Sequence, residues 1–169
     1  LSEIISVIWF FLPAGLANMA PVFAAKIPGL KNLNYPMDFN LSWRGRRIFG
    51  EHKTWRGLVS GIVVGIITIF IQQKLMVNLE SLQGFITIDY SQIDWLLLGS
   101  LLGAGAIIGD AVKSFFKRKM NIASGQTWLL CDQIDYILGG IIFSAFYFPL
   151  SFFQYSLIVM IFFTLHIAV

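Results

Sequence analysis

The chain has 169 residues, of which 57% are hydrophobic and only 12% are charged, and its mean hydropathy is +0.75. A soluble domain carries roughly 45–50% apolar and about 25% charged residues. So little charge cannot cover a soluble globule, which excludes a soluble enzyme, a disordered chain and a nucleic-acid-binding protein. The single cysteine excludes an internal disulfide and a thiolate metal cluster, and His52 and His166 are too few and too distant to suggest a zinc site. The sequence predicts one integral-membrane domain over residues 1–169.

The positions of the basic residues predict how the chain is oriented. Eleven of the twelve Lys and Arg residues fall in Lys26–Arg56 and Lys113–Lys119, and the exception is Lys74. The segment Met76–Asp94 is acidic and contains no basic residue. Basic loops stay on the cytoplasmic side of a membrane protein. Both basic stretches are therefore predicted to be cytoplasmic, and Met76–Asp94 is predicted to lie outside the cell membrane.

Five apolar stretches predict an all-α, multi-pass protein with five transmembrane helices. The first three are Ile4–Ala25, about Leu58–Ile71, and a stretch that begins at Trp95. The last run, Tyr136–Val169, is too long for one crossing of an apolar core about 30 Å thick. Pro149 predicts a turn that divides this run into two helices. With both basic loops in the cytoplasm, where they form the site, the N-terminus lies outside.

The first apolar stretch has a cleaved signal peptide as its alternative. A signal peptide carries basic residues before its apolar segment. Here no basic residue precedes Ile4, and the basic residues begin at Lys26, after the apolar segment. The flanking charges therefore favour a transmembrane helix.

The long loop Lys26–Arg56 is the next feature along the chain. Its 31 residues exceed the roughly 12–15 beyond which structureless loops are usually functional or disordered. From Arg44 to Gly57, glycines alternate with basic and aromatic residues. Basic side chains and exposed backbone N–H groups bind phosphates, and an aromatic ring can stack on a nucleobase. A solvated loop held to anionic lipid headgroups by charge is an equally good interpretation of this pattern.

The second and third stretches carry glycines at a spacing of four residues. Small residues at this spacing allow transmembrane helices to approach closely. The pattern therefore predicts a compact bundle in which these helices touch their neighbours at the following residues: Gly57, Gly61, Gly65, Gly99, Gly103, Gly105 and Gly109.

The third stretch places a carboxylate at membrane depth. To complete a crossing, the helix from Trp95 must continue to about Phe116, which puts Asp110 within the inner leaflet. A charge at such depth costs about 3 kcal/mol on insertion scales and is usually functional. The i, i+3, i+4, i+7 spacing puts four polar residues on one helical face: Asp110, Lys113, Ser114 and Lys117. A snorkelling cluster that only sets topology explains Lys117–Lys119 equally well, but it does not explain Asp110.

The start of the fourth helix adds two more carboxylates. Asp132 and Asp135 are three residues apart and therefore lie on one helical face. Together with Asp110 they form an oxygen-only set beside a basic patch, which suits a hard cation such as Mg²⁺. The alternative for either aspartate alone is that it complements the helix dipole. With the basic loops, these carboxylates favour a reaction that joins a water-soluble polyphosphate to a lipid headgroup.

Several of these blocks, in the same order, resemble the CDP-archaeol synthases of archaea. The blocks are 109–118 (GDAVKSFFKR), Gly125, and Asp132-Gln133-Ile134-Asp135, with Asn18, Ala20-Pro21, 47–50 (RIFG) and 53–57 (KTWRG). The resemblance covers nearly the whole chain. It extends to the bacterial and eukaryotic CDP-diacylglycerol synthases through an Asp-x-x-x-Ser-x-x-Lys-Arg element. Those relatives have a Pro-Gly-His-Gly-Gly stretch where this chain has 124–127 (SGQT), so the role of that histidine does not carry over.

The resemblance implies a CTP-dependent cytidylyltransferase acting on an unsaturated lipid phosphate with isoprenoid ether chains. The lipid phosphate would attack the α-phosphorus of CTP and release pyrophosphate, giving CDP-archaeol. The implied catalytic residues are Asp110, Lys113, Lys117 and Asp132. The implied ligands of Mg²⁺ are Asp110, Asp132 and Asp135. The implied nucleotide- and phosphate-binding residues are Arg46, Lys53, Thr54, Arg56, Ser114 and Arg118.

Two other classes compete with this interpretation. A CDP-alcohol phosphotransferase needs an Asp-Gly-x-x-Ala-Arg signature, which is absent. A small ion- or proton-coupled transporter would use Asp110 and Lys113 as an intramembrane relay, but the inverted repeats typical of transporters are not visible. The predicted partners are therefore CTP, the lipid phosphate and the bilayer, without nucleic acid. An oligomer is compatible with the sequence, which does not fix the number of subunits.

Overall fold

The computed structural model describes residues 1–43, 45–123 and 126–168. The fold is all-α, as predicted, apart from one minimal hairpin in which β1 and β2 pair antiparallel. The elements in chain order are α1 (Ser2–Ala24), η1 (Pro28–Leu33), β1 (Ser42–Trp43), β2 (Arg46–Arg47), α2 (Trp55–Asn78), α3 (Glu80–Gln83), η2 (Tyr90–Gln92), α4 (Trp95–Lys119), α5 (Cys131–Ala145) and α6 (Phe152–Ala168).

Three helices are long and apolar enough to cross a membrane: α1, α2 and α4, with 23, 24 and 25 residues. The C-terminal run divides around Pro149, as predicted, but α5 has only 15 residues and α6 only 17. At 1.5 Å per residue, these two helices are roughly 22 and 25 Å long, less than an apolar core of about 30 Å. Of the five transmembrane helices predicted, three have the length of a full span among the described residues, and α5 and α6 are shorter, since α5 ends at Ala145 and α6 begins at Phe152.

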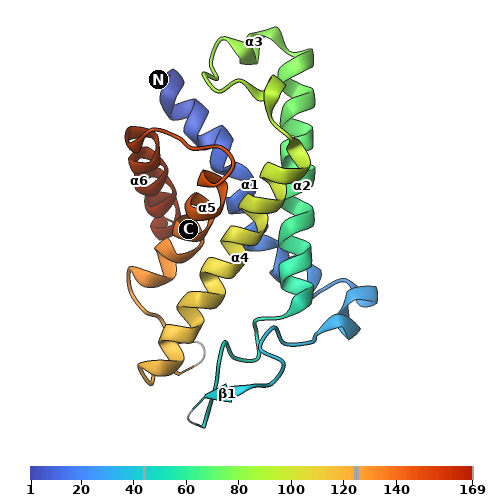
Figure 1. Cartoon of the computed structure of the whole chain (residues 1–169), viewed down its shortest axis with the longest axis vertical. Helices are drawn as coiled ribbons and strands as arrows, with labels where there is room; N and C mark the ends of the chain where they lie inside the picture. The colour runs from blue at the N-terminus through green and yellow to red at the C-terminus, as the bar shows by residue number, and fades with distance from the viewer. Residues whose placement is uncertain (44, 124–125, 169) are drawn as a thin grey trace.

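The helices alternate in direction, so the loops gather at two ends (Figure 1). The first loop (residues 25–54), with β1, and the connection from α4 to α5 lie at one end, which we call the loop end. The N-terminus and α3 lie at the opposite end. α4 has a central position, since it packs against α1, α2 and α5. The two basic stretches of the sequence therefore share the loop end.

Local signals set the ends of α2 and α4. Thr54 begins α2, and its side chain accepts a hydrogen bond from a first-turn backbone N–H. Asp94 begins α4 in the same way, with two such bonds. At the other end of α4, Asn121 adopts a left-handed conformation with φ of 63°, and the N–H of Ile122 reaches the carbonyl of Lys117 at 3.0 Å. This is a Schellman motif, which ends α4 and turns the chain towards α5.

Glycines allow the helices around α4 to touch backbone to backbone, as their spacing predicted. A Cβ built on Gly103 would lie 2.5 Å from the carbonyl oxygen of Gly61, and one on Gly105 would lie 2.5 Å from that of Gly139. Side chains at these positions would push α2 and α5 away from α4. Close backbone approach of this kind is how small residues hold helices together in lipid.

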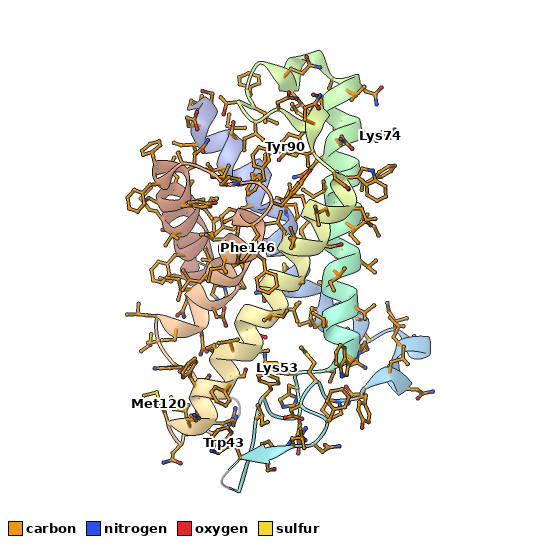
Figure 2. All side chains as sticks on the ribbon, in the orientation of Figure 1. Trp43, Lys53, Lys74, Tyr90, Met120 and Phe146 are labelled. Atoms are coloured by element: carbon orange, nitrogen blue, oxygen red, sulfur yellow. The ribbon has the colours of Figure 1, made fainter. Side chains whose placement is uncertain are left out.

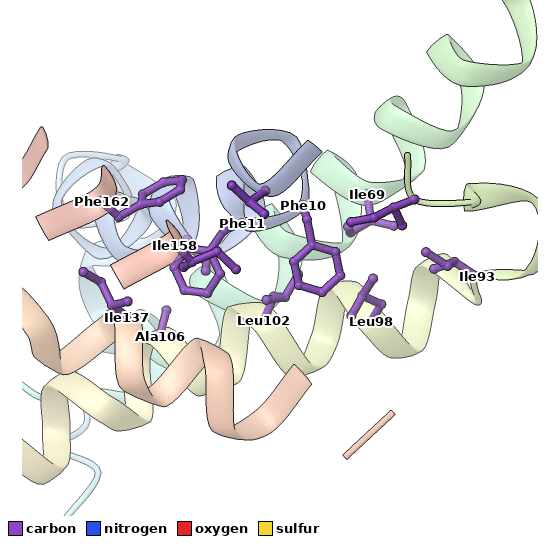
Figure 3. Packing of buried hydrophobic residues seen from close by; sticks show 14 of the residues in the cluster. Phe10, Phe11, Ile69, Ile93, Leu98, Leu102, Ala106, Ile137, Ile158 and Phe162 are labelled. Carbon is purple, nitrogen blue, oxygen red and sulfur yellow. The ribbon is translucent and has the colours of Figure 1, made fainter. Parts of the chain in front are cut away.

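The apolar core fills the middle of the bundle (Figure 3). Phe10 and Phe11 of α1 and Leu98 and Leu102 of α4 are completely buried, as is Ile158 of α6. The same cluster continues to the opposite end through residues of α2 and of the segment before α4. The described residues of this cluster do not include those of the first loop.

Candidate active site

Charged side chains from α4 and α5 meet at the loop end. The Nζ atom of Lys113 lies 3.1 Å from Oδ1 of Asp110 on its own helix. It also lies 3.0 Å from Oδ1 of Asp132 and 2.7 Å from Oδ2 of Asp135, both on α5. We call Asp110, Lys113, Asp132 and Asp135 the carboxylate cluster. One ammonium group thus joins all three predicted carboxylates.

Two more lysines contact this cluster from different directions. The Nζ of Lys117, one turn further along α4, lies 3.2 Å from both carboxylate oxygens of Asp132 and 2.5 Å from the carbonyl oxygen of Gln126. Lys53 donates to Oδ2 of Asp110 from the segment that leads into α2. Figure 2 shows Lys53 beside the loop-end half of α4. The first loop and both helices therefore contribute to one polar site.

The sequence explains why these groups converge. Asp110, Lys113 and Lys117 share one face of α4 because of their helical spacing. Gly109, next to Asp110, lies against the backbone of α5, and a Cβ on it would be 3.1 Å from the carbonyl carbon of Asp135. A glycine at this point therefore lets α5 come close enough for Asp135 to reach Lys113. The side chain of Asp135 is 5% exposed and that of Lys113 is 15% exposed, so the pair is largely shielded from solvent.

The charges of this group balance. Three ammonium groups, on Lys53, Lys113 and Lys117, match the three carboxylates. A charge taken out of water needs a partner, since an isolated buried ion is very costly. Because the positive and negative charges are equal in number, the site can lie at the depth of the membrane without an unpaired charge. The equal numbers also mean that bound phosphates require further positive charge.

A buried aspartate that the sequence patterns do not single out holds the first loop together. The carboxylate of Asp38 accepts hydrogen bonds from Arg47 at 2.6 Å and from the backbone N–H groups of Phe49 and Gly50 at 3.1 and 3.2 Å. Burial acts to raise the pKa of Asp38, but these donors outweigh it and hold the pKa below its ordinary value. Its signal in the sequence is the Asp-x-Asn spacing, since the N–H of Asn40 also binds this carboxylate.

The fastened loop forms a small polar pocket with the end of α4. Arg47, Gly50, His52 and Arg118 line it, together with Glu51, and its volume is about 310 Å³. Gly50 has φ of 97°, a left-handed conformation that favours glycine. A Cβ built on it would lie 3.6 Å from Nε of Arg118. Two of its lining residues, His52 and Arg118, directly adjoin Lys53 and Lys117 in the sequence.

Other predicted binding residues have different positions. Thr54 is buried as the N-cap of α2, and the Ser114 hydroxyl donates to the backbone carbonyl of Asp110 at 3.0 Å. Arg56 lies outside the cluster, where its guanidinium donates to the carbonyl of Leu30 at 3.3 Å and to Asn34 at 3.1 Å. Arg118 donates to a backbone carbonyl beyond α4 as well as lining the pocket. The side chain of Arg46, and residues 124 and 125 of the SGQT segment, lie outside what the structure describes.

Within the described ranges, no three His, Cys, Asp or Glu side chains are arranged to ligate a metal ion directly. The three carboxylates converge on the ammonium of Lys113 instead. One oxygen of each carboxylate nevertheless lies within 3.1 Å of this one nitrogen. The carboxylate oxygens that could ligate a metal ion therefore already surround a positive charge, the ammonium group of Lys113.

Comparison with known proteins gives the family. A family model described as "CarS-like: CDP-archaeol synthase" matches residues 1–169. The chain belongs to the CDP-archaeol synthase family. The CDP-archaeol synthase of Thermococcus onnurineus is 35% identical over 147 residues, which cover 85% of this chain and 76% of that protein. The CDP-archaeol synthase of Methanocaldococcus jannaschii is 34% identical over 157 residues, with coverage of 91% and 81%.

A solved structure shares the fold of this CDP-archaeol synthase family member. It is described as "Structural insight into an intramembrane enzyme for archaeal membrane lipids biosynthesis". The TM-score is 0.76 at 26% sequence identity, covering 98% of this chain and 92% of that one. The predicted activity, CTP-dependent cytidylyl transfer in archaeal membrane-lipid biosynthesis, is thereby confirmed. The family membership favours this enzyme over the transporter.

Proposed function

We propose that the carboxylate cluster, with Lys53 and Lys117, is the reaction centre of this CDP-archaeol synthase. The observation that carries the proposal is the convergence of three carboxylates from two helices on a single ammonium group at the loop end. A second ion pair between α4 and α5, from Lys117 to Asp132, reinforces the same site. Intramembrane ionisable groups of this kind are usually functional.

In the reaction, an oxygen of the lipid phosphate attacks the α-phosphorus of CTP. A new P–O bond forms, the bond from the α-phosphorus to the bridging oxygen of the β-phosphate breaks, and pyrophosphate carries away the electron pair. The attacking phosphate is already ionised, so no general base is required. The work of the protein is to orient the two anions and to neutralise the charge between them.

The lysines suit this work. Lys53, Lys113 and Lys117 approach the centre from the first loop and from two successive turns of α4, so they can contact phosphate oxygens from different sides. Arg47 and Arg118 line the adjoining pocket, where guanidinium groups bind phosphates well. Thr54 and Ser114 act indirectly, because one fixes the start of α2 and the other binds the backbone of α4.

The carboxylates fit Mg²⁺ in their chemistry. Asp110, Asp132 and Asp135 supply only oxygen donors, which a hard cation prefers, and all three already surround one positive charge. We propose that these three residues hold Mg²⁺ when the nucleotide binds. Bound there, the ion would neutralise triphosphate oxygens and supply the positive charge that the balanced cluster lacks.

We further propose that the chain crosses the membrane five times, with the N-terminus outside and the loop end in the cytoplasm. Alternating helix directions and the gathering of both basic stretches at the loop end support this topology. α5 and α6 are shorter than the apolar core, a mismatch that local thinning of the bilayer accommodates. In a Cys131→Ser background, Asn78→Cys should react with an impermeant thiol reagent from outside intact cells. Labelling only from the cytoplasmic side would invert the model.

The activity test uses the purified full chain with CTP, Mg²⁺ and an unsaturated isoprenoid ether-lipid phosphate. We expect equal amounts of cytidylyl lipid and pyrophosphate, and no pyrophosphate without the lipid. Asp110→Asn should abolish turnover. Asp89→Asn is the matched control, since Asp89 lies at the opposite end and its carboxylate binds Ser91 within its own turn. Full turnover by a folded Asp110→Asn variant would contradict the proposed centre.

A further inference from the structure

A second feature of the α4–α5 contact is a cavity of about 340 Å³ on its outer side. Its apolar walls include Val112, Phe116, Ile134, Leu138 and Ile142, and we call it the α4–α5 furrow. Leu138 is 44% exposed and Ile142 is 55% exposed, although both lie on a helix packed into a membrane bundle. The furrow therefore faces the lipid rather than the interior of the protein.

The furrow reaches the reaction centre. Lys113 and Asp135, which pair at 2.7 Å in the carboxylate cluster, also line this cavity. Ile142 lies seven residues beyond Asp135 on α5, about 10 Å along the helix and away from the loop end. The cavity thus has a charged end near the loops and an apolar end deeper in the bundle, in the order in which a membrane lipid presents its headgroup and chain.

We propose that the α4–α5 furrow holds the isoprenoid chain segment next to the phosphate of the lipid substrate. This inference rests on the proposed reaction centre. A molecule that reacts at the cluster and occupies the furrow must combine a phosphate with an apolar chain, and of the two substrates only the lipid phosphate does so. Its headgroup enters laterally beside Lys113, and the remainder of the chains stays in the bilayer.

A larger apolar groove, of about 1060 Å³, lies between α1, α2 and η1. Phe23, Trp55, Val59 and Val63 line it, and the charged residue there is Arg56, whose guanidinium binds the first loop. None of the carboxylate-cluster residues lines this groove. A lipid held in this groove would place its phosphate away from the carboxylate cluster. The α4–α5 furrow therefore fits the isoprenoid chain of the substrate better, although its volume is smaller.

Cysteine labelling tests the proposal directly. Cys131 is the only cysteine of the chain and lines the furrow. In a Cys131→Ser background, Leu138→Cys adds a reporter in the furrow, and Val63→Cys is its matched control in the large groove, because the two native side chains are 44% and 45% exposed. Alkylation of the purified chain with N-ethylmaleimide is followed by mass spectrometry, without CTP.

We expect the lipid phosphate, at ten times its dissociation constant, to slow alkylation of Cys131 and of Leu138→Cys about tenfold. Val63→Cys should be alkylated at an unchanged rate. Glycerol phosphate, which lacks the chains, and the matching diether lipid without phosphate should not protect. Protection of Val63→Cys instead, equal protection by the phosphate-free lipid, or no protection at either furrow position would overturn the proposal.

A kinetic pair separates this inference from the proposed function. Leu138→Trp fills the furrow and should raise the KM for the lipid phosphate about tenfold, with the KM for CTP unchanged. Val63→Trp should leave both constants unchanged. A wild-type chain that releases no pyrophosphate would refute the proposed function, whereas an active chain in which Leu138→Trp behaves as wild type would refute only the furrow.

Discussion

Aspartates at the two ends of the molecule do different work. At the opposite end, Asp89 and Asp94 accept hydrogen bonds from backbone N–H groups within their own turns, at 2.8 to 3.1 Å. At the loop end, Asp110 is held by Lys113 on its own helix and by Lys53, which is 57 residues away in the sequence. A carboxylate at a helix start finds free N–H donors nearby, whereas one inside a helix needs a cation. The partners therefore separate the two kinds of aspartate: the capping ones bind backbone N–H groups alone, whereas Asp132, although it lies in the first turn of α5, also binds Lys113 and Lys117.

The largest effect should come from removing the central ammonium group. Lys113→Met keeps much of the side-chain length but leaves three carboxylates facing one another, so we expect turnover to fall at least about a thousandfold. The thermal midpoint should also fall, and Mg²⁺ should raise it more in this variant than in the wild type. Lys74→Met is the control at the opposite end, where Lys74 contacts the ring of Phe70. If Mg²⁺ raised the thermal midpoint of Lys113→Met and of the wild type equally, the carboxylate cluster would not be the binding site of the metal ion.

A direct comparison of the two kinds of aspartate uses the same substitution at each end. Asp132→Asn removes the partner of Lys113 and Lys117 and should lower kcat about a hundredfold or more. Asp94→Asn should leave kcat within about twofold and the thermal midpoint nearly unchanged, because Asn is as good an N-cap as Asp. Similar losses at both positions would show that the change acts through folding rather than through the site.

Lys53 tests the contribution of the first loop. A charge-assisted hydrogen bond contributes about 1.5–3 kcal/mol, so Lys53→Ala should raise the KM for CTP tenfold or more. Steady-state kinetics with varied CTP measures this, and Lys31→Ala, in the same loop, is the control. An unchanged dependence on CTP would remove the first loop from the nucleotide site.

The smallest effect concerns Asp38, which fastens the loop without contacting the cluster. Asp38→Asn should increase cleavage of the first loop by a soluble protease while leaving the helices intact. Because the pKa of Asp38 in the folded loop lies below its ordinary value, its stabilisation is present above the ordinary carboxyl pKa and is lost as the pH falls through the lowered one. The difference from wild type should therefore be constant near neutral pH and shrink only in strong acid. A difference that already shrinks at neutral pH would contradict this role.

The helices and their contacts were largely predictable. Apolar stretches located α1, α2 and α4, Pro149 located the break before α6, and glycine spacing indicated the contacts of α4. These are local or periodic signals, which one sequence contains in full. The start of α5 lies beside Asp132, as predicted, but its short length was missed because the apolar pattern does not show that the helix ends at Ala145, before Pro149.

The candidate site was predictable only in part. Helical spacing put Asp110 with Lys113, and Asp132 with Asp135, on shared faces. It did not show that Lys113 would lie between the three carboxylates, because that depends on how closely α4 and α5 approach. The partners of Arg56 and Asp38 come from the folding of the first loop, whose contacts are set by tertiary structure rather than by periodicity.

Gly109 has one more consequence. It adjoins Asp110 in the chain and the Asp135 carbonyl in space, and Gly105 adjoins Gly139 one turn away. A side chain at either glycine would meet backbone atoms of α5, so only glycine allows α4 and α5 to lie this close. The glycines therefore set the distance between α4 and α5, the two helices that carry the carboxylate cluster.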